Sequence, residues 1–196
     1  MNLGKVSGLL TDLYQFTMLQ GYLDQHMDEV AVYEFFVRKL PDHRNFLVAA
    51  GLESVLDYLL TVGLAPDEIR FLKQTGRFNE RFVDYLENFA FTGDVHALPE
   101  GRVFFPDEPI LRVTAPIAQA QLVETRIINL LHYQTLVASK AARVVLSAPD
   151  KLLVDFGLRR AHGAEAGLLA ARAAYLAGFT GSSNVLAEYR FGIPSY

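Results

Sequence analysis

The strongest constraint on the fold is a strand-and-helix pattern that repeats after residue 150. Residues 152–156, LLVDF, form a continuous apolar run typical of a buried strand, and residues 166–178 predict a helix of small residues. A second, shorter unit starts at residues 179–184, and residues 191–194 begin what we expect to be another strand. Successive units of this kind predict parallel strands, and ligands of such folds bind at the carboxyl ends of the strands.

Two strand-and-helix units cannot close a barrel, because each outer strand keeps an unpaired edge. We therefore expect residues 121–196 to be a linking helix followed by the first units of an incomplete barrel, so that the chain stops in mid-domain at Tyr196. The helix itself is predicted over residues 118–146, where apolar side chains recur at helical spacing. The predicted fold class is α/β.

Residues 1–120 are expected to form an N-terminal α+β domain. Apolar periodicity predicts helices over residues 13–22, 52–62, 66–74 and 79–89. Thr11 or Asp12 can accept a hydrogen bond from the free amides of the first helix. Residues 91–116 contain three short β runs separated by proline-containing turns, which predicts a small antiparallel hairpin unit.

Residues 31–38, AVYEFFVR, are rich in β-branched and aromatic side chains and predict a strand. Alternation along a strand places Glu34, Phe36 and Arg38 on one face. Arg38 can reach a phosphate group from there, or it can pair with Glu34, four residues away on the same face. From the residues alone the ion pair is the favoured interpretation.

Composition excludes several classes of function. The 18 lysines and arginines against 22 acidic residues give a net charge of -4, which offers no basic field for nucleic acid. The absence of cysteine excludes disulfides and thiolate metal sites, and the five histidines lack metal-ligand spacing. The N-terminal residues 1–16 contain no long apolar run and predict neither a signal peptide nor a membrane anchor. We expect a soluble, cytoplasmic protein that holds no metal on its own residues.

The segment after the strand at 152–156 holds the best candidates for ligand binding. Phe156 can stack on a flat heterocycle, and Arg159 or Arg160 can grip a carboxylate or phosphate with two parallel hydrogen bonds. The alternative is that Phe156 belongs to the core and the arginines form a solvated turn. The pattern alone leaves both interpretations open.

Two further positions have a functional and a structural interpretation. His162 can act as an acid or base, although a histidine in a surface loop is the commoner case and is favoured. Ser182 and Ser183 stand before a predicted helix, where they can receive an anion or simply cap the helix. The glycine-rich nucleotide-binding motifs and the GxSxG motif are absent, so the residues alone leave the substrate open.

Seven segments, taken together and in order, resemble nicotinate phosphoribosyltransferases. They are TDLYQFTMLQGY (11–22), YEFFVRKLP (33–41), NFLVAAGLE (45–53), FTGDVHALPEG (91–101), ETRIINLLHYQTLVASKAAR (124–143), VDFGLRRAHG (154–163) and SSNVLA (182–187). A single segment such as SSNVLA is weak evidence, but the co-linear set covers nearly the whole chain and is highly specific.

The resemblance implies a type II phosphoribosyltransferase, with an N-terminal α/β domain packed on an irregular, TIM-like α/β barrel. It implies an ATP-dependent ligase, or glycosyltransferase, that joins nicotinate to phosphoribosyl pyrophosphate in NAD salvage, the pyridine nucleotide biosynthesis route. It further implies Mg2+ bound to the pyrophosphate, and a homodimer with shared active sites. Hydrolysis of ATP is coupled in the family through a phosphorylated histidine.

The resemblance also implies roles for individual residues. Phe156 matches the aromatic residue on one face of the pyridine ring, and Tyr14 matches the one that a partner subunit places on the other face. Arg159 matches an arginine beside the ring, and Arg38 matches a basic residue that reaches phosphate across the dimer interface. Asp12 matches a neighbouring polar position with no clear role.

Ser183 is implied to select nicotinate, because relatives that use nicotinamide are expected to carry an acidic residue at this place. The family's phosphorylated histidine would lie beyond Tyr196, so no catalytic residue is assigned within the chain, and His162 belongs to a different motif. Two alternatives stay open. One is a nicotinamide phosphoribosyltransferase of the same fold, and the other is a short non-catalytic protein that binds pyridine or docks on a full-length partner. On the leading hypothesis this fragment alone is inactive.

Overall fold

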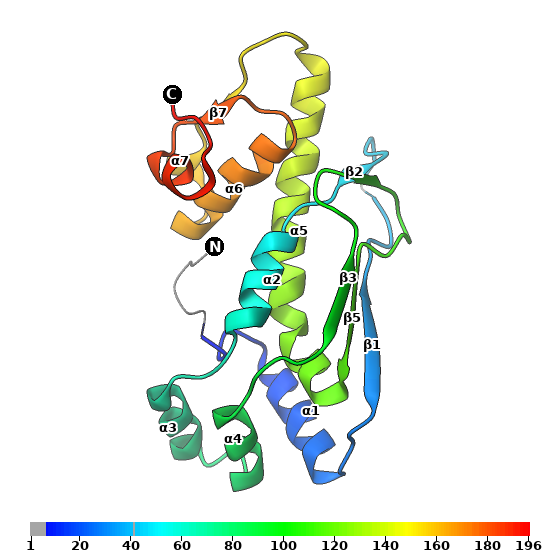
Figure 1. Ribbon diagram of the computed structural model, residues 1–196, viewed down its shortest axis with the longest axis vertical. Helices are drawn as coiled ribbons and strands as arrows, with labels where there is room; N and C mark the ends of the chain where they lie inside the picture. Colours follow the sequence, from blue (N-terminus) through cyan, green and yellow to red (C-terminus); the bar gives the residue numbers. More distant parts are fainter. Residues whose placement is uncertain (1–6, 41) are drawn as a thin grey trace.

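The computed structural model describes residues 7–40 and 42–196 (Figure 1). Part of the N-terminal segment from which the absence of a signal peptide is predicted, residues 1–6, lies outside the described residues. The last residue of the YEFFVRKLP segment, Pro41, lies outside them as well.

One long helix, α5 (Ile117–Ser147), is the element against which helices and strands from both parts of the chain pack. Its 31 residues extend over about 46 Å at the usual helical rise. Buried side chains follow each other along its whole length, from Ala118 to Ala141, so different elements pack on it from several sides. The helix predicted over residues 118–146 is confirmed.

The first half of α5 packs against a three-stranded antiparallel sheet in the order β1–β5–β3. The strands are β1 (Val30–Phe35), β3 (Asp94–Ala97) and β5 (Leu111–Pro116). The central strand alternates buried and more exposed residues, which turns Leu111, Val113 and Ala115 toward the core. Hydrophobic burial against α5 therefore fixes the register of this sheet.

The hairpin unit predicted over residues 91–116 is only partly correct. β3 and β5 do pair antiparallel, but β5 also pairs with β1, which comes from far earlier in the chain. The middle β run of this segment, β4 (Val103–Phe104), lies outside this sheet and pairs with β2 (Leu47–Val48). Phe104 and Leu47 are buried there, so the gain from a second small core outweighs the local hairpin.

The predicted N-terminal helices are confirmed. They are α1 (Leu13–Asp24), α2 (Leu52–Thr61), α3 (Pro66–Thr75) and α4 (Glu80–Glu87). Phe16, Phe78 and Phe82 bring α1 and α4 together through edge and stacked ring contacts. The cap predicted for α1 is wrong, because neither Thr11 nor Asp12 accepts a helix amide. Asp12 instead accepts a hydrogen bond from the Thr125 hydroxyl at 3.3 Å.

The strand-and-helix units follow α5, and α6 packs along it. They comprise β6 (Val154–Asp155), the short 3-10 helix η1 (Leu158–Arg160), α6 (Ala164–Leu176), β7 (Gly181–Ser182) and α7 (Val185–Phe191). β6 and β7 are parallel, and Ser182 makes a further parallel bridge to Ser195. The chain is thus of the α/β class, with a parallel arrangement that begins after α5.

Two boundaries in this part differ from the prediction. The strand at 152–156 is only two residues long, because β7 offers a partner to Val154 and Asp155 alone. The strand expected from residue 191 is reduced to an isolated bridge at Ser195, since α7 runs on to Phe191 and ends at Gly192, whose φ of 67° suits glycine. The division of the chain after residue 120 falls in the first turn of α5, and it stays a prediction.

Candidate functional site

The carboxyl ends of β6 and β7 lie side by side and form what we call the ring edge, which consists of Phe156, Arg159 and Ser183. Asp155 pairs with Ser182 in parallel register, so the next residue of each strand leaves the sheet at the same edge. The Ser183 amide donates to the Asp155 carbonyl at 2.8 Å, and this hydrogen bond holds the carboxyl ends of the two strands together.

The side chains of Asp155 and Ser182 form hydrogen bonds within the protein, below the ring edge, rather than facing a ligand. Asp155 Oδ1 accepts from the Gly157 amide at 3.0 Å, and the buried Ser182 hydroxyl lies 3.2 Å from Asp155 Oδ2. Asn184 caps α7 by accepting from the Leu186 amide. The prediction that Ser182 or Ser183 caps this helix is therefore wrong, and the half-buried Ser183 side chain is not used as a cap.

Phe156 is on the surface, with 58% of its area exposed. The structure thereby decides against the interpretation of Phe156 as a core residue. Arg159 and Arg160 lie on η1 directly after it and are exposed. An exposed aromatic side chain followed closely in the chain by two exposed arginines offers the residue types that bind a flat anionic ligand.

His162 is exposed in the loop between η1 and α6, as its position in the sequence predicts. Tyr133 of α5 fixes the start of α6 by donating its hydroxyl to the Ala166 carbonyl at 2.8 Å. Burial and the charge of Asp155 both raise the pKa of Tyr133, so this hydroxyl stays protonated and keeps its donor role.

Arg38 is not paired with Glu34, and the prediction of that ion pair is wrong. Glu34 accepts from Arg112, which stands directly opposite it on β5, with an Nε to Oε1 distance of 2.8 Å. Direct cross-strand neighbours are closer than residues four apart on one chain segment, which explains why Glu34 pairs with Arg112 instead of Arg38. Arg38 instead lines a groove of about 470 Å³ between β1, β5 and α5, together with Glu124.

Within one chain the five candidate side chains do not all meet. Phe156, Arg159 and Ser183 share the ring edge, in the strand-and-helix units that follow α5. Tyr14 begins α1, which packs on the first half of α5, and Arg38 follows β1 in the sheet region (Figure 1).

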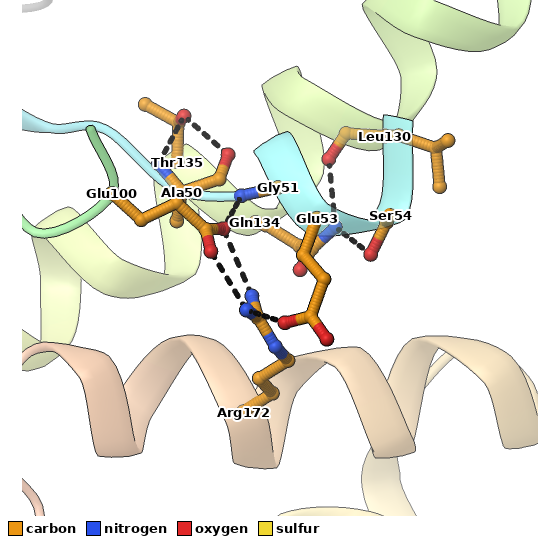
Figure 2. A network of polar contacts seen from close by, with 9 residues as sticks. All are labelled: Ala50, Gly51, Glu53, Ser54, Glu100, Leu130, Gln134, Thr135 and Arg172. Carbon is orange, nitrogen blue, oxygen red and sulfur yellow. Dashed lines mark hydrogen bonds and ion pairs between the residues drawn. The ribbon is translucent and has the colours of Figure 1, made fainter. Parts of the chain in front are cut away.

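A cluster of charged side chains, which the sequence analysis missed, joins the ring-edge unit to the rest of the molecule (Figure 2). Arg172 of α6 donates to both carboxylate oxygens of Glu100, at 2.9 and 2.7 Å, and it also pairs with Glu53 of α2. Glu100 Oε1 additionally accepts from the Gly51 amide at 2.5 Å. We call Arg172, Glu100 and Glu53 the Arg172 cluster.

Arg172 and Glu100 are largely buried, whereas Glu53 of the Arg172 cluster is half exposed. Burial alone would raise the pKa of Glu100, yet hydrogen bonds and charge from Arg172, with amide bonds from Gly51 and Leu52, hold that pKa below its ordinary 4.5. Burial would lower the pKa of Arg172, but the two carboxylates raise it. One signal in the sequence could have located the cluster, because Arg172 is the single charge inside the apolar segment AGLLAARAAYLAG.

Residues 7–40 and 42–196 contain neither a candidate metal-binding cluster nor a candidate membrane-spanning helix. No three His, Cys, Asp or Glu side chains there are grouped so that they could hold a metal ion. None of the helices in this part of the chain is long and apolar enough to cross a lipid bilayer.

The fold and the ring edge define the class, an α/β protein whose parallel strands end beside an exposed aromatic side chain and exposed arginines. A family model described as the nicotinate phosphoribosyltransferase (NAPRTase) N-terminal domain matches residues 9–132, more than half of the chain. The chain belongs to this nicotinate phosphoribosyltransferase family, and the resemblance seen in the sequence is confirmed.

Individual relatives agree with this assignment. The chain is 48% identical over 191 residues to a nicotinate phosphoribosyltransferase of Mycobacterium tuberculosis, which covers 97% of this chain and 41% of the relative. It is 41% identical over 187 residues to that of Bacillus subtilis, with 95% and 38% covered. The chain spans about two fifths of the length of these curated relatives.

Solved structures show the same likeness. The crystal structure of human nicotinic acid phosphoribosyltransferase matches with a TM-score of 0.88 and 39% identity, over 95% of this chain and 38% of that one. A nicotinate-nucleotide pyrophosphorylase from Pyrococcus furiosus shares the fold, with a TM-score of 0.77 at 23% identity, over 100% of this chain and 44% of that one.

Proposed function

We propose that this chain forms the N-terminal, ring-binding part of a nicotinate phosphoribosyltransferase that acts in the cytoplasm in NAD salvage. The observation that carries the proposal is the exposed ring of Phe156 at the end of β6, beside Ser183 at the end of β7. The names of the relatives support the same reaction, the transfer of a phosphoribosyl group to nicotinate.

This reaction mainly requires the protein to position the pyridine ring and to neutralise the negative charge of the phosphates. The pyridine nitrogen donates its electron pair to C1 of the ribose, while the bond from C1 to the pyrophosphate oxygen breaks and pyrophosphate leaves with those electrons. We assign Phe156 to stack on the pyridine ring and Arg159 to balance the negative charge beside it. Neither residue exchanges a proton in this scheme.

We assign Tyr14 to the second face of the pyridine ring and Arg38 to phosphate, both supplied by the other subunit of a homodimer. The support is their position, since both are on elements other than the ring-edge unit of their own chain. Tyr14 is half exposed, which leaves part of its ring free for a second molecule.

ATP and Mg2+ belong to this proposal as reactants of the complete enzyme. The described residues offer no group of three ligating side chains for a metal ion, and both Asp155 carboxylate oxygens already have hydrogen-bond partners. The residues present do not fit a metal site of their own, so no step assigned to this chain passes through the metal.

Ser183 is the proposed determinant of substrate choice. A neutral hydroxyl tolerates the carboxylate of nicotinate, whereas an acidic side chain would repel it and could accept a hydrogen bond from the amide of nicotinamide. Ser183→Asp should therefore weaken nicotinate binding about ten-fold or more. Isothermal titration with nicotinate and nicotinamide measures the preference, and tighter binding of nicotinamide to the unmodified protein would contradict this assignment.

The overall test starts from the protein as its source makes it. An antibody against this segment isolates the native protein, and its intact mass is compared with the 21.9 kDa of the present chain. The isolated protein is then assayed for ATP-dependent formation of nicotinate mononucleotide. Activity supports the proposal, whereas an inactive protein of 21.9 kDa that binds nicotinate would favour the non-catalytic alternative.

A further inference from the structure

A second group of buried polar side chains surrounds Gln15 on α1. The Gln15 side chain is fully buried, and its amide nitrogen lies 3.0 Å from the Tyr14 hydroxyl oxygen. The same nitrogen lies 3.2 Å from Glu124 Oε2 and 3.1 Å from Thr125 Oγ1, both on α5. Gln15 therefore connects the hydroxyl of Tyr14 to the long helix.

The orientation of the Gln15 amide is determined by its neighbours. The Gln121 oxygen accepts from the hydroxyls of Tyr33 and Tyr22, at 3.0 and 3.4 Å, so its nitrogen must face the other way. That nitrogen donates to the Gln15 oxygen. With its oxygen occupied in this way, Gln15 turns its own nitrogen toward Tyr14 and must act as the donor.

The contact between Gln15 and Tyr14 also restricts the tyrosine ring. Neighbouring residues on a helix point about 100° apart and do not normally face each other. A bond between the two side chains therefore requires the Tyr14 ring to lie back toward α5 while half of its surface stays exposed. A ring held in one orientation with a free face is what stacking on a ligand requires.

We propose that Gln15 is a positioning residue that fixes the orientation of Tyr14 for stacking on the pyridine ring. This inference rests on the proposed function for its kinetic consequence, but the orientation of Tyr14 is a property of the chain itself. Gln15 touches no substrate and acts only through the Tyr14 hydroxyl.

The kinetic test compares Gln15→Met with the unmodified enzyme as isolated from its source. Loss of one positioning hydrogen bond should raise the KM for nicotinate about three- to ten-fold. The KM for phosphoribosyl pyrophosphate should stay the same. Tyr14→Phe removes the acceptor instead of the donor and should give the same selective increase.

A matched control and a double variant show whether Gln15 acts through Tyr14. Gln20→Met is the same substitution on the same helix, but Gln20 accepts from the Asn79 amide and does not contact Tyr14, so the KM for nicotinate should not change. In the Tyr14→Phe background, Gln15→Met should add nothing further. A full additional effect there, or no effect of Gln15→Met alone, would overturn the inference.

A structural readout keeps this inference separate from the proposed function. Fluorotyrosine incorporated at the tyrosines, nine of which lie in this chain, gives fluorine NMR signals, and the one lost in Tyr14→Phe belongs to Tyr14. This signal should shift in Gln15→Met and stay in place in Gln20→Met. An unmoved signal overturns the inference even if the enzyme is active, whereas a shifted signal in an enzyme without nicotinate activity refutes only the proposed function.

Thr125→Val provides the test if Gln15→Met does not fold. It removes one acceptor of the Gln15 amide on α5 and leaves Gln15 in place. The Tyr14 signal should shift in the same direction as in the other variants, by a smaller amount. No shift in Thr125→Val, with Gln15→Met unfolded, would count against Gln15 as the link between Tyr14 and α5.

Discussion

The ring edge and Arg172 belong to the same series of strand-and-helix units but differ in burial and in their partners. At the Arg172 cluster, a guanidinium group with 9% of its side chain exposed meets a carboxylate with 15% exposed, and both have several hydrogen bonds. At the ring edge, Phe156 and Arg159 are exposed. One region fastens the unit to α2 and the β3–β4 turn, and the other is left open for a ligand.

The two regions show how a small structural unit can be held rigidly on one side and still expose side chains to a ligand on the other. A site works best when its residues are held by rigid supporting elements rather than by the ligand. Here α6 supplies the support from its buried face, while the loop after β6 supplies the candidate contacts. Variants of the two regions should therefore have opposite effects on stability and on binding.

The largest effect is expected from Arg172→Met. The substitution leaves the Glu100 carboxylate buried without its cation, and loss of one partner of a buried pair costs about 3–5 kcal/mol. Urea unfolding measures the free energy of unfolding. Arg159→Met, the matched change at the ring edge, should alter it by less than about 0.5 kcal/mol. Equal losses in the two variants would remove the distinction between the regions.

The next largest effect is expected from Gly51→Ala. Gly51 has a φ of 107°, and a Cβ there would lie 2.8 Å from the Leu130 carbonyl oxygen of α5. The strained backbone and the clash together should cost about 2–4 kcal/mol. Gly76→Ala is the control, since Gly76 has a φ of 62° but open space around it, and it should cost about 1 kcal/mol. Thermal unfolding of both variants decides whether the clash matters.

A smaller effect is expected from acid. Because the folded state holds the pKa of Glu100 below 4.5, its contribution to stability is fully present above that pH and is lost as pH falls through the lower folded pKa. The free energy of unfolding should therefore decrease below pH 4.5, and less steeply in Glu100→Gln. The loss should be smaller than in Arg172→Met, because a protonated Glu100 still accepts hydrogen bonds. Identical slopes in urea titrations across this range would contradict the assignment.

The smallest effect on stability is expected from Phe156→Ala. An exposed ring contributes little to folding, so the free energy of unfolding should change by less than about 0.5 kcal/mol. Nicotinate binding should weaken about three- to ten-fold, because a stacked aromatic contact is lost. Calorimetry measures the affinity, and Tyr189→Ala, on the exposed face of α7, is the control with unchanged affinity. A loss of stability without a loss of affinity would place Phe156 in the packing.

Much of the fold could be predicted from the sequence because its signals are local. The long helix and the four N-terminal helices follow from apolar periodicity, and the parallel units follow from the order of strand and helix. Partners far apart in the chain could not be predicted in this way. Arg112 replaces Arg38 as the partner of Glu34, and β4 joins β2, only because the folded chain brings these segments together.

The candidate site shows the same limit. The place of Phe156 after a predicted strand and the place of Ser183 before a predicted helix indicate these two residues, and the family resemblance adds Tyr14 and Arg38. Gln15 could not be recognised, since a glutamine within a helical pattern has no signal that distinguishes a buried donor from a surface residue. Its role depends on α5, more than a hundred residues later in the chain.

The continuity of α5 has a consequence for the order in which the molecule opens. This helix has no break between the part that supports α1 and the sheet and the part that supports α6, and its middle holds buried Gln134 and Ser139. Amide protons in that middle can exchange with solvent only when elements on both sides detach. The turns around Gln134 should therefore be among the last to exchange, and the two halves should lose structure together as one cooperative unit.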